Sequence, residues 1–425
     1  MSVAEASHDR DPRRHFIPVH KSDIVRGLAA EAKLVAAGEG EKWRDFCRLL
    51  AAIFHYDYFA DLERLKEAYY YFNPHHGGEP PTEASWAAAY QGLIATLRRV
   101  LSDANFVEVT KEEIEAAHRA HALLAVEVAT PVEDYGDIRF FRRGKHMDEV
   151  ESAGWFRKTK RAIEVYDDVV LIAAAKQLDQ LVTKAQQRRL RHGGFHDGRV
   201  IIKYFRDIAS ADLRTLLPHV RPIMSARDKW FLGLPALLGG IPLLLKLVPV
   251  LAVLALLAGI RLGGAGPVEA GGLKQSLIVL GGLLALGGFI GHQWLKYKHQ
   301  SLRYQLDLAD NLYFRNLNNN AGLFDAVIGT AEEQECKEAF LAYFFLLGEP
   351  ASRAALDARI AAWLARHFAC ELDLKIDEGI ARLATLGLLN RAGETFSVPP
   401  LAEALDRLGH HWDGVRRDGT RAQVQ

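Results

Sequence analysis

The sequence predicts an α+β membrane protein, mostly helical, in which a two-helix transmembrane hairpin separates two larger parts. Three observations lead to this fold class. Long apolar runs occupy 231–260 and 273–294, short β-prone runs follow residue 122, and a helix–helix–β-hairpin pattern lies within 350–413. We therefore expect a cytoplasmic α+β N-terminal domain, the hairpin, and a C-terminal helical, winged-helix-like domain.

The membrane hairpin is predicted over 230–296. A spanning helix needs about 20 mostly apolar residues, and both runs reach that length with a short polar link between them. Because prolines divide the first run, the spanning helices are expected near 242–261 and 273–294. The alternative is a buried pair of core helices, although such helices normally keep a polar face. The expected membrane-interface residues are Trp230, Lys246 and Trp294.

Charge asymmetry predicts the orientation of this hairpin. Basic residues flank it on both outer sides, whereas the link carries only Arg261 and Lys274. Lysine and arginine near spanning segments stay in the cytoplasm, so both termini should be cytoplasmic. Residues 1–15 contain no apolar run, so no secretory signal is expected. These features predict a protein of the bacterial inner (cytoplasmic) membrane.

Composition and motifs exclude several function classes. The formal net charge is zero, with 53 basic and 53 acidic residues, which argues against a general nucleic-acid binder. The three cysteines, Cys47, Cys336 and Cys370, lie far apart, which indicates a reducing compartment without a structural zinc site. The motifs GxxxxGK[ST], GxSxG and HExxH do not occur. We therefore predict no cofactor, no metal and no catalytic residue.

Residues 16–220 are expected to form one α+β domain after a disordered tail at 1–15. Apolar residues at three- and four-residue spacing predict a long helix over 41–72. Thr110 and Glu113 have the spacing of a capping box, which predicts the start of a later helix. The runs ALLAVEV, DIRFFRR, VVLIAAAK and RVIIKYFRDI then predict a small antiparallel sheet laid against the helices.

The connector at 300–348 holds the candidate site. An asparagine-rich loop precedes a helix expected from about Leu323 to Leu347, and helical geometry places Glu335 on an apolar face of it. A carboxylate on such a face needs a partner. One interpretation is a polar site for an ion, a proton or a small ligand; the other is a structural ion pair with an arginine such as Arg315. The candidate residues are Glu332, Glu335, Glu338, Asn318, Asn319 and Asn320.

The module at 350–413 has the order of a winged helix, with a β-hairpin turn at 391–393 and a disordered tail expected at 414–425. Its second helix would be the DNA-reading one, which needs basic side chains without repulsion from acidic neighbours. Lys375 and Arg382 stand instead among acidic residues. We expect a packing or protein-contact module rather than a DNA-binding one. The acidic neighbours are Asp373, Asp377 and Glu378.

Several motifs resemble the transmembrane protein 143 family. They are RVIIKYFRDIASADLRTLLPHVRPIMSARDKWFLGLPALLGG, NLYFRNLNNNAGLFDAVIGTAEEQECKEAFLAYFFL and the closing LDRLGHHWDG, and the similarity spans roughly 16–413. This resemblance implies a membrane protein with paired helices and a domain of unknown function. It carries over no activity and no catalytic residues.

These observations predict a membrane-anchored scaffold or protein-interaction module. Its expected partners are the lipid bilayer and either another protein or a second copy of the chain, and not nucleic acid. The alternative is an oligomeric channel or transporter subunit with the second spanning helix near its axis, because glycine and alanine in that helix would let helices approach closely. An enzyme is the third interpretation.

Overall fold

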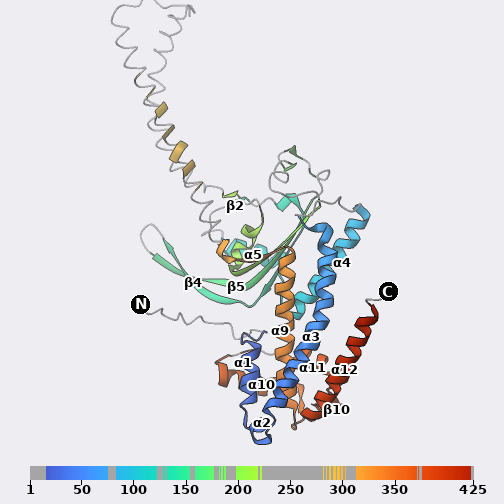
Figure 1. The fold of residues 1–425 in the computed structure, drawn as a ribbon. Helices are drawn as coiled ribbons and strands as arrows, with labels where there is room; N and C mark the ends of the chain where they lie inside the picture. Colours follow the sequence, from blue (N-terminus) through green and yellow to red (C-terminus); the bar gives the residue numbers. More distant parts are fainter. Residues whose placement is uncertain are drawn as a thin grey trace, which may run out of the picture. The chain divides into compact units, whose positions relative to one another are not determined.

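The computed structural model describes residues 16–74, 83–121, 132–153, 158–176, 198–218, 313–370 and 376–422, with short or single positions between them. The chain divides into two compact units (Figure 1). The larger unit comprises Met1–Ala120, Pro131–Leu217 and Arg315–Gln425, and the smaller comprises His121–Thr130 and Pro218–Phe314. In the smaller unit, β2 (Val128–Ala129) pairs antiparallel with β7 (Arg221–Pro222).

An antiparallel sheet forms one part of the larger unit. Its main order is β1-β3-β5-β6-β8, and β4 also pairs with β5. The strand β3 pairs with the second half of β5, and β4 pairs with the first half of β5. The apolar run in β5 is continuous because both of its faces are buried there, as Val169 and Val170 show. The strands are β1 (Val107–Glu108), β3 (Tyr135–Arg143), β4 (His146–Ala153), β5 (Lys158–Ala175), β6 (Val200–Ala209) and β8 (Asn316–Asn319).

Helices cover one face of this sheet (Figure 1). Two long helices, α3 (Gly40–Tyr69) and α9 (Ala321–Leu346), pack on the sheet and also extend into a second, mainly helical core. The predicted capping box is confirmed, since Glu113 N donates to Thr110 Oγ1 at 3.2 Å and Thr110 N donates to Glu113 Oε2 at 2.8 Å. The other helices before the sheet are α1 (Lys21–Ala29), α2 (Ala32–Ala37), α4 (Glu83–Asp103) and α5 (Lys111–His121).

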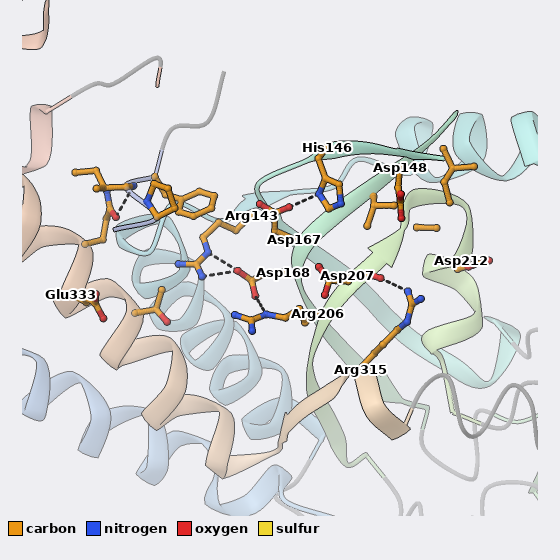
Figure 2. Close-up of a pocket in the computed structure, with 18 of the residues that line it drawn as sticks. Arg143, His146, Asp148, Asp167, Asp168, Arg206, Asp207, Asp212, Arg315 and Glu333 are labelled. Atoms are coloured by element: carbon orange, nitrogen blue, oxygen red, sulfur yellow. Dashed lines mark hydrogen bonds and ion pairs between the residues drawn. The ribbon is translucent and has the colours of Figure 1, made fainter. Parts of the chain in front are cut away.

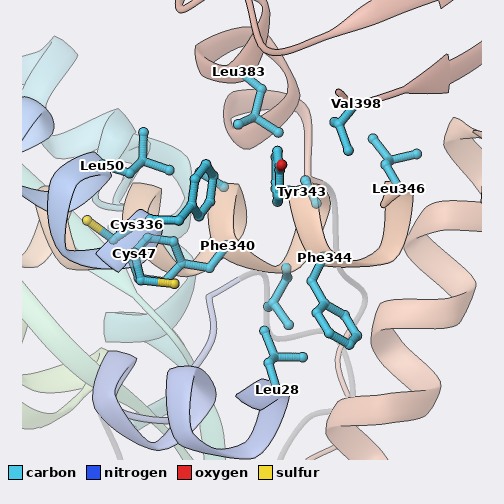
Figure 3. Close-up of a cluster of buried hydrophobic side chains, with 14 of the residues drawn as sticks. Leu28, Cys47, Leu50, Cys336, Phe340, Tyr343, Phe344, Leu346, Leu383 and Val398 are labelled. Atoms are coloured by element: carbon cyan, nitrogen blue, oxygen red, sulfur yellow. The ribbon is translucent and has the colours of Figure 1, made fainter. Parts of the chain in front are cut away.

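The second core joins early and late parts of the chain (Figure 3). Phe46 on α3 stacks on Tyr343 of α9, with ring centroids 4.1 Å apart. Trp43 meets Phe344 edge-on at 5.7 Å, and the Tyr343 hydroxyl donates to the main-chain oxygen of Pro399 at 2.9 Å. The second half of α9 is therefore surrounded by packed side chains, which explains why its sequence shows no clean polar face.

The chain after α9 forms a winged-helix-like module. A three-stranded sheet of order β10-β11-β9 accompanies two helices, and Ser352 caps the first helix by accepting from Ala355 N at 3.4 Å. The last helix extends to Ala422, into the stretch expected to be a disordered tail. The elements are β9 (Ala351–Ser352), α10 (Arg353–Phe368), α11 (Asp377–Thr385), β10 (Asn390–Ala392), β11 (Thr395–Ser397) and α12 (Leu401–Ala422).

The helices correct the membrane-protein interpretation. Among the residues that the structure describes, no helix is both long and apolar enough to cross a membrane. The helix α9 has the length, with 26 residues, yet it carries Glu332, Glu335 and Lys337 among its apolar side chains. The membrane fold class, the inner-membrane scaffold and channel functions and the inner-membrane localisation rest on the apolar runs, their basic flanks and the family resemblance. They are wrong for the part of the chain that the structure describes.

The predicted hairpin lies almost entirely outside the described residues. None of 242–261 is described, and only scattered positions within 273–294 are. Of the expected membrane-interface residues, Trp230 and Lys246 also lie outside, whereas Trp294 is described and exposed. The expected contact with a lipid bilayer has the same basis as the hairpin and is withdrawn with the membrane interpretation.

Candidate functional site

Three residues with irregular backbone or pairing lie in one row across the sheet. The register places Gly144, Asp167 and Asp207 opposite one another, and the regular pairing of β3–β4, β5 and β6 is interrupted at this row. Gly144 has a φ of 65° and Asp207 a φ of 54°. A Cβ at Gly144 would lie 2.2 Å from Asp167 Oδ2 and 2.9 Å from the ring of Phe16. We call Gly144, Asp167 and Asp207 the crease; backbone strain of this kind clusters at functional sites.

A cavity of about 860 Å³ lies at the crease (Figure 2). Its walls come from the segment at 16–18, strands β3 to β6, and α9. The lining is strongly charged and contains six carboxylates, four basic side chains and one histidine. The carboxylates are Asp148, Asp167, Asp168, Asp207, Asp212 and Glu333. The other charged or titratable residues are Arg143, Arg206, Arg315, Lys337 and His146.

His146 and Asp167 form a close pair in this cavity. His146 Nδ1 lies 2.6 Å from Asp167 Oδ1, and both side chains are largely buried. Gly144 turns the chain between β3 and β4, so it lets His146 face the aspartate across the ladder. A carboxylate in this position fixes the orientation of the imidazole.

Asp168 belongs to a buried and fully paired group. Arg143 donates to Asp168 Oδ2 from Nε at 3.0 Å and from Nη2 at 2.6 Å, and the Tyr204 hydroxyl donates to Oδ1 at 2.9 Å. The Arg143 guanidinium also lies 4.8 Å from the ring centroid of Phe16 and 5.2 Å from that of Phe106. These contacts make Asp168 a rigid part of the wall.

Two other carboxylates have open hydrogen-bonding capacity. Within the described residues, no hydrogen bond or ion pair reaches the carboxylate of Asp148 or that of Asp207. Arg315 donates to the main-chain oxygen of Asp207 and not to its side chain. Arg206 lies 3.8 Å from Asp168 and its side chain is 60% exposed. Asp148 on β4 and Asp207 on β6 therefore present carboxylate acceptors that no described donor reaches, although His146 and Arg206 on the same strands also line the cavity.

The opposite wall consists of α9 and the main chain of Ile17. Gln334 accepts from Ile17 N at 3.2 Å, and Lys337 Nζ donates to Ile17 O at 3.0 Å. Lys337 Nζ also lies 3.0 Å from Glu333 Oε1. Burial lowers the pKa of Lys337 although the nearby Glu333 carboxylate partly opposes this. Burial alone would raise the pKa of Glu333, but the charge and hydrogen bond of Lys337 outweigh it and lower that pKa.

The structure places the predicted glutamates elsewhere on α9, and none of them lines the cavity. Glu335 lies 2.9 Å from Arg382, so its arginine is Arg382 and not Arg315. Glu332 contacts Lys21 at 3.4 Å and His55 at 2.8 Å. Glu338 is buried and accepts from main-chain and amide donors. Burial raises its pKa to about 8, although the hydrogen bonds from Gln334 and Gly379 partly offset this.

The predicted asparagines shape the chain entering α9. Asn318 pairs with Tyr204 and Asn319 pairs with Lys203 in the β6–β8 ladder. Asn320 has a φ of 51°, and its Oδ1 accepts from Ile202 N at 3.3 Å. Asparagine tolerates this left-handed conformation better than most residues. The structure thus brings the asparagines to the sheet edge and not to the three glutamates.

Metal binding has no geometric support in the part of the chain that the structure describes. There, no three His, Cys, Asp or Glu side chains are arranged to hold a metal ion. The cavity carboxylates come from β4, β5, β6, the 3-10 helix at Ser210–Leu216 and α9, which spreads them around its walls (Figure 2).

Sequence reasoning missed the cavity because its residues come from separate stretches spread between residues 16 and 337. One signal was present. Asp167 and Asp168 interrupt the apolar run VYDDVVLIA, and Asp207 interrupts YFRDIA. Aspartate is unfavourable inside a strand, so a pair of strands that both contain it indicates a shared polar feature.

A family model described as "Protein of unknown function (DUF3754)" matches residues 166–322. The matched stretch begins within β5 and includes Asp167, Asp168, Asp207 and the asparagine-rich strand β8. No solved structure matches the chain. The chain therefore carries a domain of unknown function whose matched residues include two of the three members of the crease.

Proposed function

We propose that the chain is a binding protein for a small, positively charged ligand that occupies the cavity at the crease. The observation that carries this proposal is the carboxylate excess of the lining, in which Asp148 and Asp207 have no donor within the described residues. Carboxylates grouped in a confined space repel one another, and a bound cation relieves that repulsion. The volume of about 860 Å³ lies in the range of small-molecule sites.

An amine is the ligand class that suits these walls. Ammonium groups donate several hydrogen bonds and can contact separated carboxylates, which a single metal ion needing a compact ligand set cannot do. Asp148 lies on β4 and Asp207 on β6, with β5 between them, so a ligand needs two separated amines to reach both. His146, paired with Asp167, would add a titratable contact.

Calorimetric titration of the full chain tests this proposal. Spermidine and putrescine serve as amine probes, and succinate serves as the charge-reversed control. We expect saturable binding of the amines and at least about 10-fold weaker binding in Asp148→Asn and in Asp207→Asn. A tenfold loss of affinity corresponds to about 1.4 kcal/mol of binding free energy, which we expect from the loss of one charge pair. Asparagine tolerates the positive φ of Asp207, so the backbone should persist.

The matched control is Asp45→Asn. Asp45 lies on α3, is 60% exposed and pairs with Arg48, away from the cavity. Its substitution should leave amine binding unchanged. Equal binding by wild type and Asp148→Asn, or tighter binding of succinate than of either amine, would exclude the proposed ligand class.

The 2.6 Å contact of His146 with Asp167 favours a second candidate function, acid–base catalysis on an amine-bearing substrate. A histidine held by a carboxylate can accept a proton from an attacking water. The test is a hydrolysis screen with esters and amides of small amines. Turnover by the wild type and its absence in His146→Gln would support catalysis, whereas no turnover by either would leave binding as the function.

We also propose that the winged-helix-like module contacts a protein partner or a second copy of the chain and not nucleic acid. What supports this is the engagement of Arg382 on α11, which lies 2.9 Å from Glu335 and 3.4 Å from Asp57. The other basic residue of that stretch, Lys375, lies outside the described residues. The expected result is no binding of duplex DNA by the full chain near 150 mM salt.

The relation to the transmembrane protein 143 family also stays a proposal. It is supported by the quoted motifs, the first of which lies within the matched domain of unknown function at 166–322 and the second of which overlaps its end. A ligand or proton role for Glu332, Glu335, Glu338 and the asparagines at 318–320 is likewise a prediction, and only Glu338 is developed further below.

A further inference from the structure

Buried polar contacts lead from the cavity to the first turn of α11. The cavity end is the main chain of Ile17, which lines the cavity. The far end is the main-chain N–H of Gly379. Gln334 and Glu338 on α9, each 2% exposed, connect the two. We call Ile17, Gln334, Glu338 and Gly379 the relay.

The direction of each hydrogen bond in the relay is fixed. The N–H of Ile17 can only donate, so Gln334 presents Oε1 to it at 3.2 Å. This leaves Gln334 Nε2 to donate to Glu338 Oε1 at 2.9 Å. The second oxygen of Glu338 accepts from Gly379 N at 3.3 Å. Each member therefore constrains the orientation of the next.

The helix α11 depends on Glu338 because it has no capping side chain of its own. Its N-cap residue is Ile376, which offers no side-chain acceptor, and the N–H groups of a first helical turn need acceptors. A Cβ at Gly379 would lie 2.7 Å from the main-chain carbon of Glu338. The first turn of α11 thus lies directly on the backbone of α9 and follows the position of the Glu338 carboxyl group.

The Ile17 end of the relay is held by charged side chains, and a cation in the cavity would disturb them. Lys337 Nζ donates to Ile17 O at 3.0 Å and lies 3.0 Å from Glu333, and all three residues line the cavity. A cationic ligand would compete with Lys337 for Glu333 and repel the lysine ammonium. Either effect shifts the main chain of Ile17, and therefore changes the hydrogen bond that Ile17 N donates to Gln334 Oε1.

We propose that the relay reports occupancy of the cavity to the C-terminal module, so that binding of a cationic ligand changes the stability of the first turn of α11. This inference rests on the proposed function for its ligand. Coupling between two sites in one protein typically amounts to about 5- to 150-fold. We therefore expect the hydrogen-exchange rate of the Gly379 amide to change by about 5-fold or more when the cavity is filled.

The experiment measures amide hydrogen exchange in α11 of the full chain, with and without spermidine, in the wild type and in Glu338→Gln. A glutamine at this position replaces one of the two accepting oxygens with an NH2 group, which donates and so cannot accept from Gln334 Nε2 or from Gly379 N. Glu338 does not line the cavity, so spermidine binding should persist while the response at Gly379 disappears. Spermidine binding without a change at Gly379, or an equal response in Glu338→Gln, would overturn the relay and leave the proposed function standing.

A second arm needs no ligand. Lys337→Met removes the hydrogen bond from Lys337 Nζ to Ile17 O, and should change the hydrogen-exchange rate of the Gly379 amide by a similar factor. Lys21→Met is the control, because the Lys21 ammonium contacts Glu332 at 3.4 Å outside the relay. If exchange at Gly379 is the same in Lys337→Met and wild type, the relay is wrong whichever ligand binds. If no amine binds the wild type, the proposed function fails and the Lys337→Met arm still decides the relay.

Discussion

The Arg382 guanidinium connects α11 to both long helices, because it lies 2.9 Å from Glu335 on α9 and 3.4 Å from Asp57 on α3. It also lies 5.1 Å from the ring centroid of Phe54. Burial alone would lower the pKa of Arg382, but the charge of Glu335 and its hydrogen bond outweigh burial and raise that pKa. This one side chain therefore holds the second helix of the C-terminal module in place.

Glu335→Ala should destabilise the protein by about 2–3 kcal/mol, measured as the free energy of urea unfolding. Removing one partner of a fully buried pair costs about 3–5 kcal/mol, and Asp57 still accompanies Arg382, which reduces the loss. Glu67→Ala, an exposed position on α3, should change stability by less than about 0.5 kcal/mol. Equal unfolding free energies for the two variants would show that the Glu335–Arg382 contact contributes nothing.

Stability should fall as the pH rises from about 5 to 8. Burial raises the pKa of Glu338 to about 8 and that of Glu378 to about 7. The unfolded chain loses these protons near pH 4.5, whereas the folded protein keeps them, so the contribution is complete below pH 4.5 and is lost as the pH passes the folded values. Glu338→Gln does not titrate and should flatten the profile. Urea unfolding at pH 5, 6, 7 and 8 checks this, and a profile as steep as that of the wild type would contradict it.

Gly144→Ala should cost about 3 kcal/mol in unfolding free energy. The positive φ accounts for about 1–2 kcal/mol, and the new methyl group would collide with Asp167 Oδ2, only 2.2 Å away. Gly38→Ala separates the two causes, because Gly38 has a φ of 65° and nothing within 4 Å of its Cβ position. A loss no larger than that of Gly38→Ala would mean that Asp167 moves aside without penalty.

Asn320→Ala should be more destabilising than Asn320→Gly. Both lose the hydrogen bond to Ile202 N, about 1 kcal/mol, but glycine adopts the φ of 51° freely and alanine does not. Thermal unfolding of the two variants measures the difference. If glycine is as damaging as alanine, the amide side chain matters more than the backbone, which would favour the predicted ligand role of the asparagines.

Local patterns in the sequence predicted local structure well. The spacing of Thr110 and Glu113 indicated a capping box, and both of its hydrogen bonds are present. Helical spacing also placed Glu335 correctly inside the protein, where it is 6% exposed. These features depend on neighbours within one or two helical turns, so the sequence contains the information directly.

Long-range features could not be read in the same way. The partner of Glu335 is 47 residues away, and only the packing of α11 on α9 selects Arg382 instead of Arg315. The crease needs the relative register of neighbouring strands to align Gly144, Asp167 and Asp207, and no single strand specifies that register. The membrane interpretation relied on hydropathy, flanking charge and family resemblance, none of which identifies what surrounds a helix.

The position of α9 in the chain has a consequence for folding. Side chains of α9 complete both cores, against α3 in one and against α3, α4 and the sheet in the other. A ribosome delivers α3 and α4 first and must reach Ala331 before the core on the sheet can close, and Leu408 before the mainly helical core can. The nascent N-terminal helices therefore expose apolar surface until the later residues are synthesised. Large proteins in such a state are prone to aggregate. Folding of this chain should be largely post-translational and limited by the arrival of its C-terminal third.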